Sequence, residues 1–241
     1  MNIHPNALLL MYVIMNIMRD LISGEWYHVY NRGVEKRRIF LDNEDYARFL
    51  FHLYECNNSV TLPDTAFKRR IREVNFAMDN RDRLVDVMAF SLMPNHFHIL
   101  VRPCQDNGIS SFMQRVSVAY TKGFNKKYQR VGALFQGPYK AKLADKGAYL
   151  QHILVYILTN ALDIYKPDWK DRGMGNLKEA KRFLENYRYS SYLSAMGGKD
   201  VFNFIIDKGS LRDAVESPKD LEIMINDILS GGVSDVDMRV F

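Results

Sequence analysis

Cysteine is scarce in this chain of 241 residues. Cys56 and Cys104 are the two present, and their separation fits neither a metal-binding knuckle nor a redox pair. Two isolated cysteines exclude a disulfide-stapled framework and are typical of a protein of the reducing cytoplasm. The chain also lacks a glycine-rich phosphate loop of the ATPase kind, so its sequence does not indicate nucleoside triphosphate chemistry.

Long hydrophobic runs are missing as well. The apolar stretch near the start, residues 7–18, is too short to span a membrane. It has no basic leader and no small-residue cleavage site, so a secretory signal is not expected. Met11, Met15 and Met18 are all possible starts, and we expect translation to begin near Met18, with residues 1–23 as an extension of the gene or a disordered start. We expect a cytoplasmic protein with no membrane partner.

Charge is plentiful but unevenly placed. The whole chain carries +5, while residues 200–241 hold nine acidic and four basic side chains, a net charge of −5. The preceding part therefore carries +10. A basic body indicates a polyanionic partner, most simply a nucleic acid. An ordinary solvated charged surface explains the net charge about as well.

Two histidines on one predicted strand are the most informative feature. Pro94 and Asn95 are turn residues, and the aromatic and branched run from Phe97 to Val101 predicts a buried strand. Side chains alternate along a strand, so His96 and His98 point to the same face. Two neutral imidazoles at this spacing can hold one metal ion. A histidine pair can also be partly buried polar surface, and spacing alone does not decide between the two.

A helical pattern downstream supplies further polar groups. Residues 148–162 form an amphipathic helix pattern in which Tyr156 and Asn160, four residues apart, share an otherwise apolar face. Buried phenol and amide groups need partners. A metal held by His96, His98 and Asn160, with the Tyr156 phenol beside it, would satisfy all of them. These mixed nitrogen and oxygen ligands fit Mg²⁺ or Mn²⁺.

Four segments in this order resemble a known family. They are Tyr27–Gly33, Met93–His98, Gly132–Gln136 and Tyr156–Asn160. Together they resemble the HUH-type single-tyrosine transposases, closest to the REP-associated tyrosine transposases, over about residues 24–192. The resemblance implies that His96, His98 and Asn160 hold a divalent metal and that Tyr156 is the nucleophile. It also implies cleavage and rejoining of single-stranded or hairpin DNA through a 5′-phosphotyrosine.

This chain departs from the family pattern at two places. Relatives commonly have Asn-Pro after the tyrosine, where this chain has Asn160-Ala161. It also carries an insert at residues 57–83, in which Phe67–Ile71 predicts a short basic helix.

The predicted elements indicate an α+β fold. Strands at 27–31, 84–93 and 97–102, and an extended segment at 134–143 that is interrupted at Gly137-Pro138, alternate with helices that begin at Asp42, Gly108 and Ala148. This order predicts an antiparallel sheet with packed helices, which matches the ferredoxin-like (RNA-recognition-like) core that the resemblance implies. We expect a catalytic domain at 24–165 and a helical acidic C-terminal extension at 166–241. That extension either screens the DNA-binding face or packs on the core through Phe202, Phe204, Ile205 and Ile206.

Several residue assignments have alternatives. Tyr120 is a rival nucleophile, although its apolar neighbours favour core packing. His28 either lines the site or, as we favour, hydrogen-bonds within the sheet, and Gln136 either reads a base or supports a turn. The candidates for contacts with DNA are Arg32, Arg37, Arg38, Lys122, Lys126, Lys127, Gln136, Lys140 and Lys142.

Other functions and the oligomeric state also stay open. A replication-initiator nickase could use the same site, but such proteins often carry a second tyrosine on the helix, and none lies near Tyr156 on its metal-facing stripe. A catalytically silent, hairpin-binding module is the alternative outside the enzymes. A monomer and a homodimer are both compatible with the sequence.

Overall fold

The sheet at the centre of the molecule has the predicted ferredoxin-like order. The computed structural model describes residues 24–60 and 81–231. Its strands are β1 (Tyr27–Arg32), β2 (Val85–Met93), β3 (His96–Pro103) and β4 (Lys140–Leu143), arranged β2-β3-β1-β4. All neighbouring strands are antiparallel. With α2 (Asn43–Glu55) after β1 and α4 (Gly108–Lys127) after β3, the chain follows the ferredoxin-like connectivity, which confirms the predicted α+β class.

The hairpin that carries the two histidines forms as the sequence predicts. Pro94 and Asn95 make the turn, and β3 begins at His96, one residue before the predicted strand. His98 lies opposite Ser91 of β2 and Tyr30 of β1, while His96 lies opposite Met93 and Arg32. Both histidines are therefore held by ladder hydrogen bonds on a central strand, which fixes the separation of their side chains.

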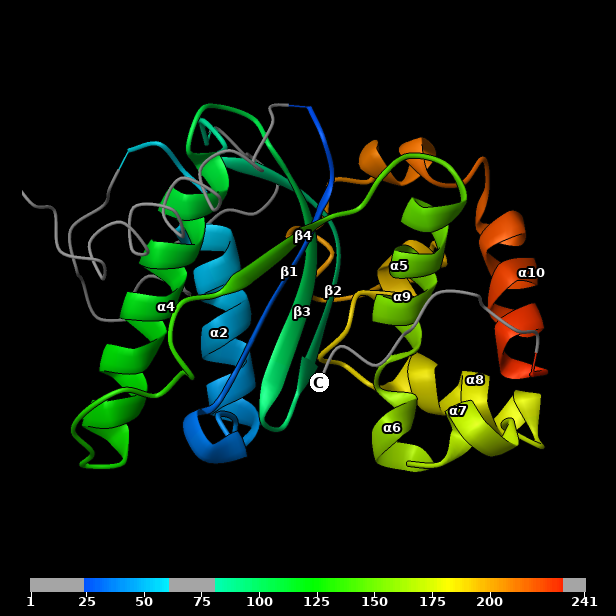
Figure 1. Cartoon of the computed structure of the whole chain (residues 1–241), viewed down its shortest axis with the longest axis horizontal. Coiled ribbons are helices and arrows are strands. Elements are labelled where there is room, and N and C mark those ends of the chain that lie inside the picture. The colour runs from blue at the N-terminus through cyan, green and yellow to red at the C-terminus, as the bar shows by residue number, and fades with distance from the viewer. Residues whose placement is uncertain (1–23, 61–80, 232–241) are drawn as a thin grey trace, which may run out of the picture.

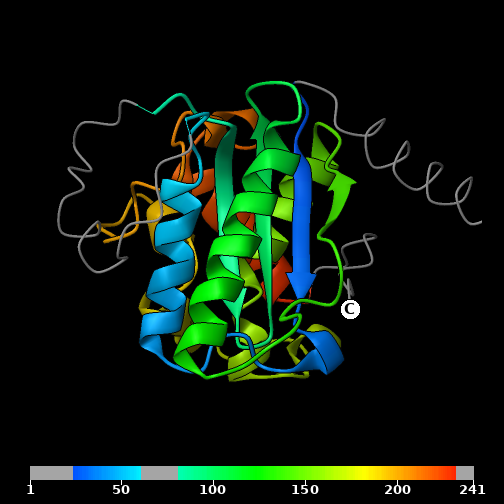
Figure 2. The same ribbon diagram turned by 90° about the vertical axis from the view of Figure 1, so that its left-hand side faces the viewer.

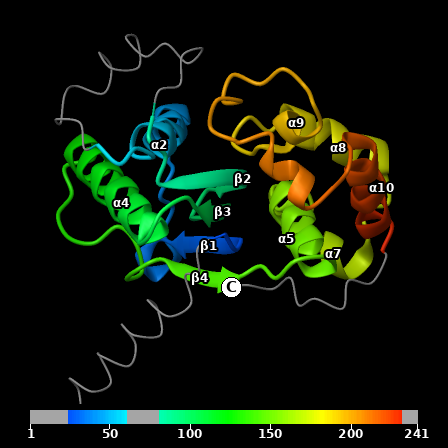
Figure 3. The same cartoon turned by 90° about the horizontal axis from the view of Figure 1, so that it is seen from above.

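Helices cover both faces of the sheet. In Figure 2, α2 and α4 lie side by side across one face, and their apolar sides share a buried core with Phe97, Ile99 and Val101 of β3. The other face is covered by α5 (Ala148–Thr159), which packs against β2 and β3 (Figures 1 and 3). Alternating residues of one strand thus enter two different cores.

The tyrosine helix ends earlier than the sequence predicts. α5 stops at Thr159, and α6 (Leu162–Tyr165) follows after a break. At the break the Asn160 amide N–H bonds to the Ile157 carbonyl three residues back rather than four. Asn160 keeps helical backbone angles, with φ −56° and ψ −33°. Its side chain therefore still lies one turn after Tyr156.

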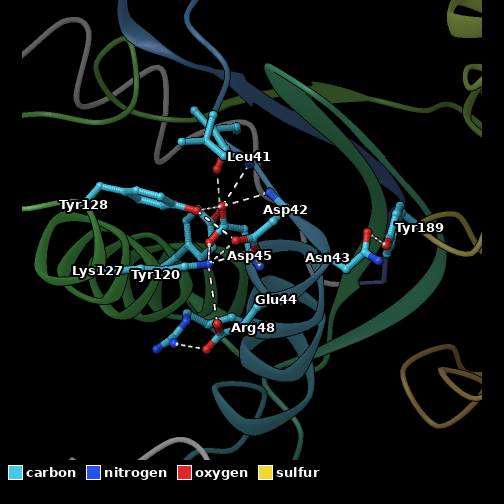
Figure 4. A network of polar contacts seen from close by, with 11 residues as sticks. Leu41, Asp42, Asn43, Glu44, Asp45, Arg48, Tyr120, Lys127, Tyr128 and Tyr189 are labelled. Carbon is cyan, nitrogen blue, oxygen red and sulfur yellow. Dashed lines mark hydrogen bonds and ion pairs between the residues drawn. The ribbon is translucent and has the colours of Figure 1, made fainter.

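The start of α2 is held by a dense polar network (Figure 4). Asp42 and Asp45 form a capping box, as the sequence predicts for an Asp42 cap. Lys127, from the end of α4, places Nζ 2.7 Å from Asp42 Oδ2 and 2.8 Å from Asp45 Oδ1. The side-chain hydrogen bond from Lys127 lowers the pKa of Asp42. Lys127 thus ties α4 to α2 rather than presenting an uncommitted cation to DNA, in contrast to our prediction.

The chain after α6 builds the outer layer over α5. Its elements are α7 (Trp169–Arg172), α8 (Leu177–Asn186), α9 (Tyr192–Ala195), the 3₁₀ turn η2 (Ser210–Asp213) and α10 (Pro218–Leu229). Apolar side chains of this segment, among them Leu184, Leu221 and Ile225, share one buried core with α5. Figure 1 shows these helices gathered on the α5 side of the sheet.

The described part of the acidic segment packs on the protein. Ile205 and Ile206 are buried in the core beneath α2 and α4, and Phe202 and Phe204 pack against it. Several acids pair locally with bases; the pairs are Asp207 with Arg83, Asp213 with Arg102 and Glu222 with Lys181. The described residues therefore support the packing alternative over the screening one.

Three expectations concern residues outside the described ranges, 24–60 and 81–231. The proposed start near Met18 and the basic helix at 67–71 fall outside the described residues, as does the end of the acidic segment after residue 231. No helix in the described ranges is both long enough and apolar enough to cross a membrane.

Candidate active site

The predicted site residues converge between the sheet and α5. The rings of His98 and Tyr156 meet edge to face with centroids 5.2 Å apart, and those of His96 and His98 lie 5.0 Å apart. The Asn160 side chain lies close enough to both groups to lower the pKa of the Tyr156 phenol and to raise that of His96. One strand and one helix end thus bring all four side chains together.

Burial sets the protonation states of this cluster. His98 is fully buried and Tyr156 is 3% exposed. Burial lowers the pKa of His96 to about 4, and that of His98 well below its usual value. Both imidazoles are therefore neutral at physiological pH, which is the form that binds metal ions. Burial also raises the pKa of the Tyr156 phenol, so it is protonated at rest.

His28 both lines the candidate site and hydrogen-bonds within the sheet, so the interpretation we favoured and its alternative apply together. Its Nε2 lies 2.8 Å from His98 Nδ1, and its ring centroid lies 5.9 Å from that of Tyr156. Burial, with a smaller contribution from Lys142, lowers its pKa to about 3. The signal in the sequence was the alternation of His28 with Tyr30 on one strand face, but only the pairing of β1 with β3 brings that face to the histidines.

Four of the candidate DNA contacts border the histidines. Arg32 lies opposite His96 and its Nε donates to the Gln136 side chain. Lys140 lies with Nζ 6.0 Å from the centroid of the Tyr30 ring, and Lys142 is opposite His28. These side chains form a polar rim beside the buried cluster.

The other candidate DNA contacts lie on other elements. Lys122 and Lys126 are exposed on α4, which covers the opposite face of the sheet. Arg37 and Arg38 follow the 3₁₀ turn η1 (Val34–Lys36) that succeeds β1. Lys122 and Lys126 are therefore separated from the histidines by the sheet.

The rival tyrosine is a core residue. Tyr120 is fully buried between α4 and α2, and its hydroxyl donates to the carbonyl of Ile39. Burial raises the pKa of this phenol. It faces away from the histidines because α4 lies on the opposite side of the sheet from α5.

Sequence reasoning missed two charged residues near Tyr156. Lys170 of α7 places Nζ 5.2 Å from the centroid of the Tyr156 ring, and it donates to Asp163 Oδ2 at 2.9 Å. Both side chains influence the pKa of His96, Asp163 raising it and Lys170 lowering it. Their sequence neighbourhood is an ordinary polar loop, so no local pattern distinguished them.

The central part of the chain is similar to a known protein family. Residues 52–160 match the family model described as "Transposase IS200 like", and this range contains His96, His98, Tyr156 and Asn160. No curated protein matches the sequence. A solved structure of a REP-associated tyrosine transposase bound to a REP hairpin is 13% identical, with a TM-score of 0.45, over 73% of this chain and 82% of that one. The central part of the chain, residues 52–160, is thus similar to the IS200-like transposase family.

Proposed function

We propose that this protein cleaves and rejoins single-stranded DNA at hairpin or palindromic sites through a 5′-phosphotyrosine on Tyr156. The convergence of Tyr156 with His96, His98 and Asn160 in one buried cluster is the observation that carries this proposal. The hairpin substrate follows the sequence resemblance.

The proposed reaction is a transesterification. A bond forms between Tyr156 Oη and the phosphorus as the bond from phosphorus to the 3′ oxygen breaks. The phenol proton leaves to solvent and the departing 3′ oxygen takes one up, so a 3′ hydroxyl results. Attack of a 3′ hydroxyl on the phosphotyrosine reverses these changes and rejoins DNA without an external energy source.

The residues of the cluster fit a divalent metal. The buried Asn160 Oδ1 has no hydrogen-bond partner among the described residues, and the neighbouring imidazoles are neutral. No group of three His, Cys, Asp or Glu side chains in the described ranges could hold a metal, so the amide oxygen would have to complete the set. His96, His98 and Asn160 would hold Mg²⁺ or Mn²⁺. A bound metal would polarise the phosphate and offset the charge that develops on it.

The chain's own groups orient the nucleophile. The Asn160 side chain lies beside both the Tyr156 phenol and His96, and the packing of α5 on β3 holds the phenol ring against His98. The buried setting also excludes water, which would otherwise compete for the phosphotyrosine.

Covalent capture tests the proposal. The protein is incubated with Mn²⁺ and a labelled single-stranded hairpin oligonucleotide, and the adduct is separated in denaturing gels. Tyr156→Phe should abolish the adduct and leave binding largely intact, because only the nucleophilic hydroxyl is removed. Tyr120→Phe, a matched change on the other side of the sheet, should retain the adduct.

Two results would contradict the assignment. The adduct could persist in Tyr156→Phe and disappear in Tyr120→Phe or in a Tyr30→Phe variant. That result would assign the nucleophile to Tyr120 or Tyr30 instead of Tyr156. Tight hairpin binding by the wild type without any adduct would favour the catalytically silent binding module.

A further inference from the structure

Lys170 is a cation beside the proposed nucleophile, Tyr156, and it belongs to the part of the chain that follows the family match. It lies ten residues beyond that match, which ends at residue 160. Its Nζ is 5.2 Å from the Tyr156 ring centroid, and its charge lowers the pKa of both His96 and His98. It therefore lies beside the Tyr156 ring, at the start of α7.

The lysine is held in place by a carboxylate that is itself anchored. Lys170 Nζ donates to Asp163 Oδ2 at 2.9 Å, while Asp163 Oδ1 accepts from Trp169 Nε1 at 2.7 Å. The backbone N–H of Asp163 in turn bonds to the carbonyl of Asn160 at 3.1 Å. Because Trp169 is 2% exposed, the arrangement connects the lysine rigidly to the end of the tyrosine helix.

A purely structural role explains this arrangement poorly. Trp169 already docks α7 through its buried indole. The Lys170 and Asp163 side chains are 20% and 32% exposed, and ion pairs of partial exposure contribute little to stability. A cation here also opposes protonation of the two buried imidazoles.

A phosphate at the Tyr156 oxygen would lie within reach of this ammonium group. An ammonium has three N–H donors, of which the bond to Asp163 uses one. Negative charge on the phosphate oxygens must be offset as the new O–P bond forms. Arg32 lies on the His96 side of the cluster, and Lys170 lies on the Tyr156 side.

We propose that Lys170 is a further catalytic residue, which donates to the phosphate undergoing attack by Tyr156, and that Asp163 is its positioning residue. This inference rests on the proposed function, because it takes Tyr156 as the nucleophile. It assigns part of the active site to the segment beyond the family match, which was expected to be an appendage.

The test compares charge-removing variants within α7. Lys170→Met and Lys170→Gln are compared with Arg172→Met, which removes an equal charge two residues away on a side chain that is 77% exposed. For each, the single-turnover rate of adduct formation at saturating hairpin oligonucleotide and Mn²⁺, the Kd for the oligonucleotide and the unfolding temperature are measured. Lys170→Met and Lys170→Gln should slow adduct formation about 100-fold, the effect of losing one charge-stabilising donor.

Other readouts separate catalysis from structure. The Kd and the unfolding temperature of the Lys170 variants should stay close to those of Arg172→Met, and Lys170→Arg should recover most of the rate. Asp163→Asn should lose less rate than Lys170→Met, because the lysine remains.

The experiment distinguishes failure of the role proposed for Lys170 from failure of the proposed function. A wild type that forms an adduct, with Lys170→Gln reacting as fast as Arg172→Met, overturns the role of Lys170 alone. A wild type that forms no Tyr156-dependent adduct overturns the proposed function and this inference with it.

Discussion

At the scale of single residues, His28 determines how its neighbour can act. His98 Nδ1 is engaged with His28 Nε2 at 2.8 Å, so His98 Nε2 is the nitrogen that would bind a metal. For Nε2 to keep its lone pair, Nδ1 must carry the proton and donate it to His28. The lowered pKa of His28 keeps its ring neutral and able to accept that proton. His28 thus sets the tautomer and orientation of a candidate ligand.

We predict that His28→Phe weakens Mn²⁺ binding by roughly 10–100-fold, since the ring is kept and the acceptor is lost. His28→Gln should recover part of the affinity because its amide oxygen can accept the same proton. Calorimetric titration measures both, with the His96→Ala/His98→Ala double variant as the reference for lost binding. Unchanged affinity in His28→Phe, alongside loss in the double variant, would show that His28 does not orient the ligand.

At the scale of elements, a backbone hydrogen bond at Gly33 connects the end of β1 to the turn of the histidine hairpin. The Gly33 N–H donates to the carbonyl of Asn95 at 2.8 Å. A Cβ at Gly33 would collide with the backbone carbonyl oxygen of Arg37. No side chain therefore fits at this position unless the backbone around η1 shifts. The glycine of the Tyr27–Gly33 motif is therefore required by close packing of backbone.

Gly33→Ala should accordingly lower the free energy of unfolding by about 1–3 kcal/mol, the usual cost of overpacking. Gly123→Ala is the matched control. A Cβ there would lie 3.1 Å from Arg48 Cδ, a flexible side chain, and alanine is favoured over glycine within a helix by up to about 1 kcal/mol. Urea denaturation compares the two, and equal stabilities would contradict the packing argument.

At the scale of the whole molecule, the C-terminal segment is part of both cores. Ile205 and Ile206 enter the core beneath α2 and α4, while Leu221, Ile225 and Leu229 enter the core around α5. Burying each such side chain contributes roughly 1.5–3 kcal/mol, or on the order of 10 kcal/mol for the five. That sum is comparable with the whole stability of a typical domain, about 5–15 kcal/mol.

Deletion of residues 200–241 should therefore abolish cooperative folding, which circular dichroism and thermal denaturation would show. Deletion of residues 232–241 removes none of these five buried side chains and is the control. A folded protein truncated at residue 199 that binds DNA more tightly would instead restore the screening alternative.

Local sequence patterns were enough to predict the class of fold and the central residues of the candidate site. Strand alternation set His96 and His98 on one face, and helical spacing set Tyr156 and Asn160 on another. Both are local regularities of backbone geometry, and the resemblance joined them into one site. The turn at Pro94 and Asn95 and the cap at Asp42 are likewise local, and both formed as predicted.

Contacts between distant parts of the chain determine which further side chains lie beside these residues and which candidate side chains lie elsewhere. His28 enters because β1 pairs with β3, and Lys170 enters because Trp169 docks α7 beside α5. Lys127 pairs with Asp42 and Asp45 instead of offering its charge to DNA, because α4 ends beside the start of α2. These outcomes depend on contacts between residues far apart in the chain, and neither the charge nor the spacing of a side chain specifies its distant neighbours.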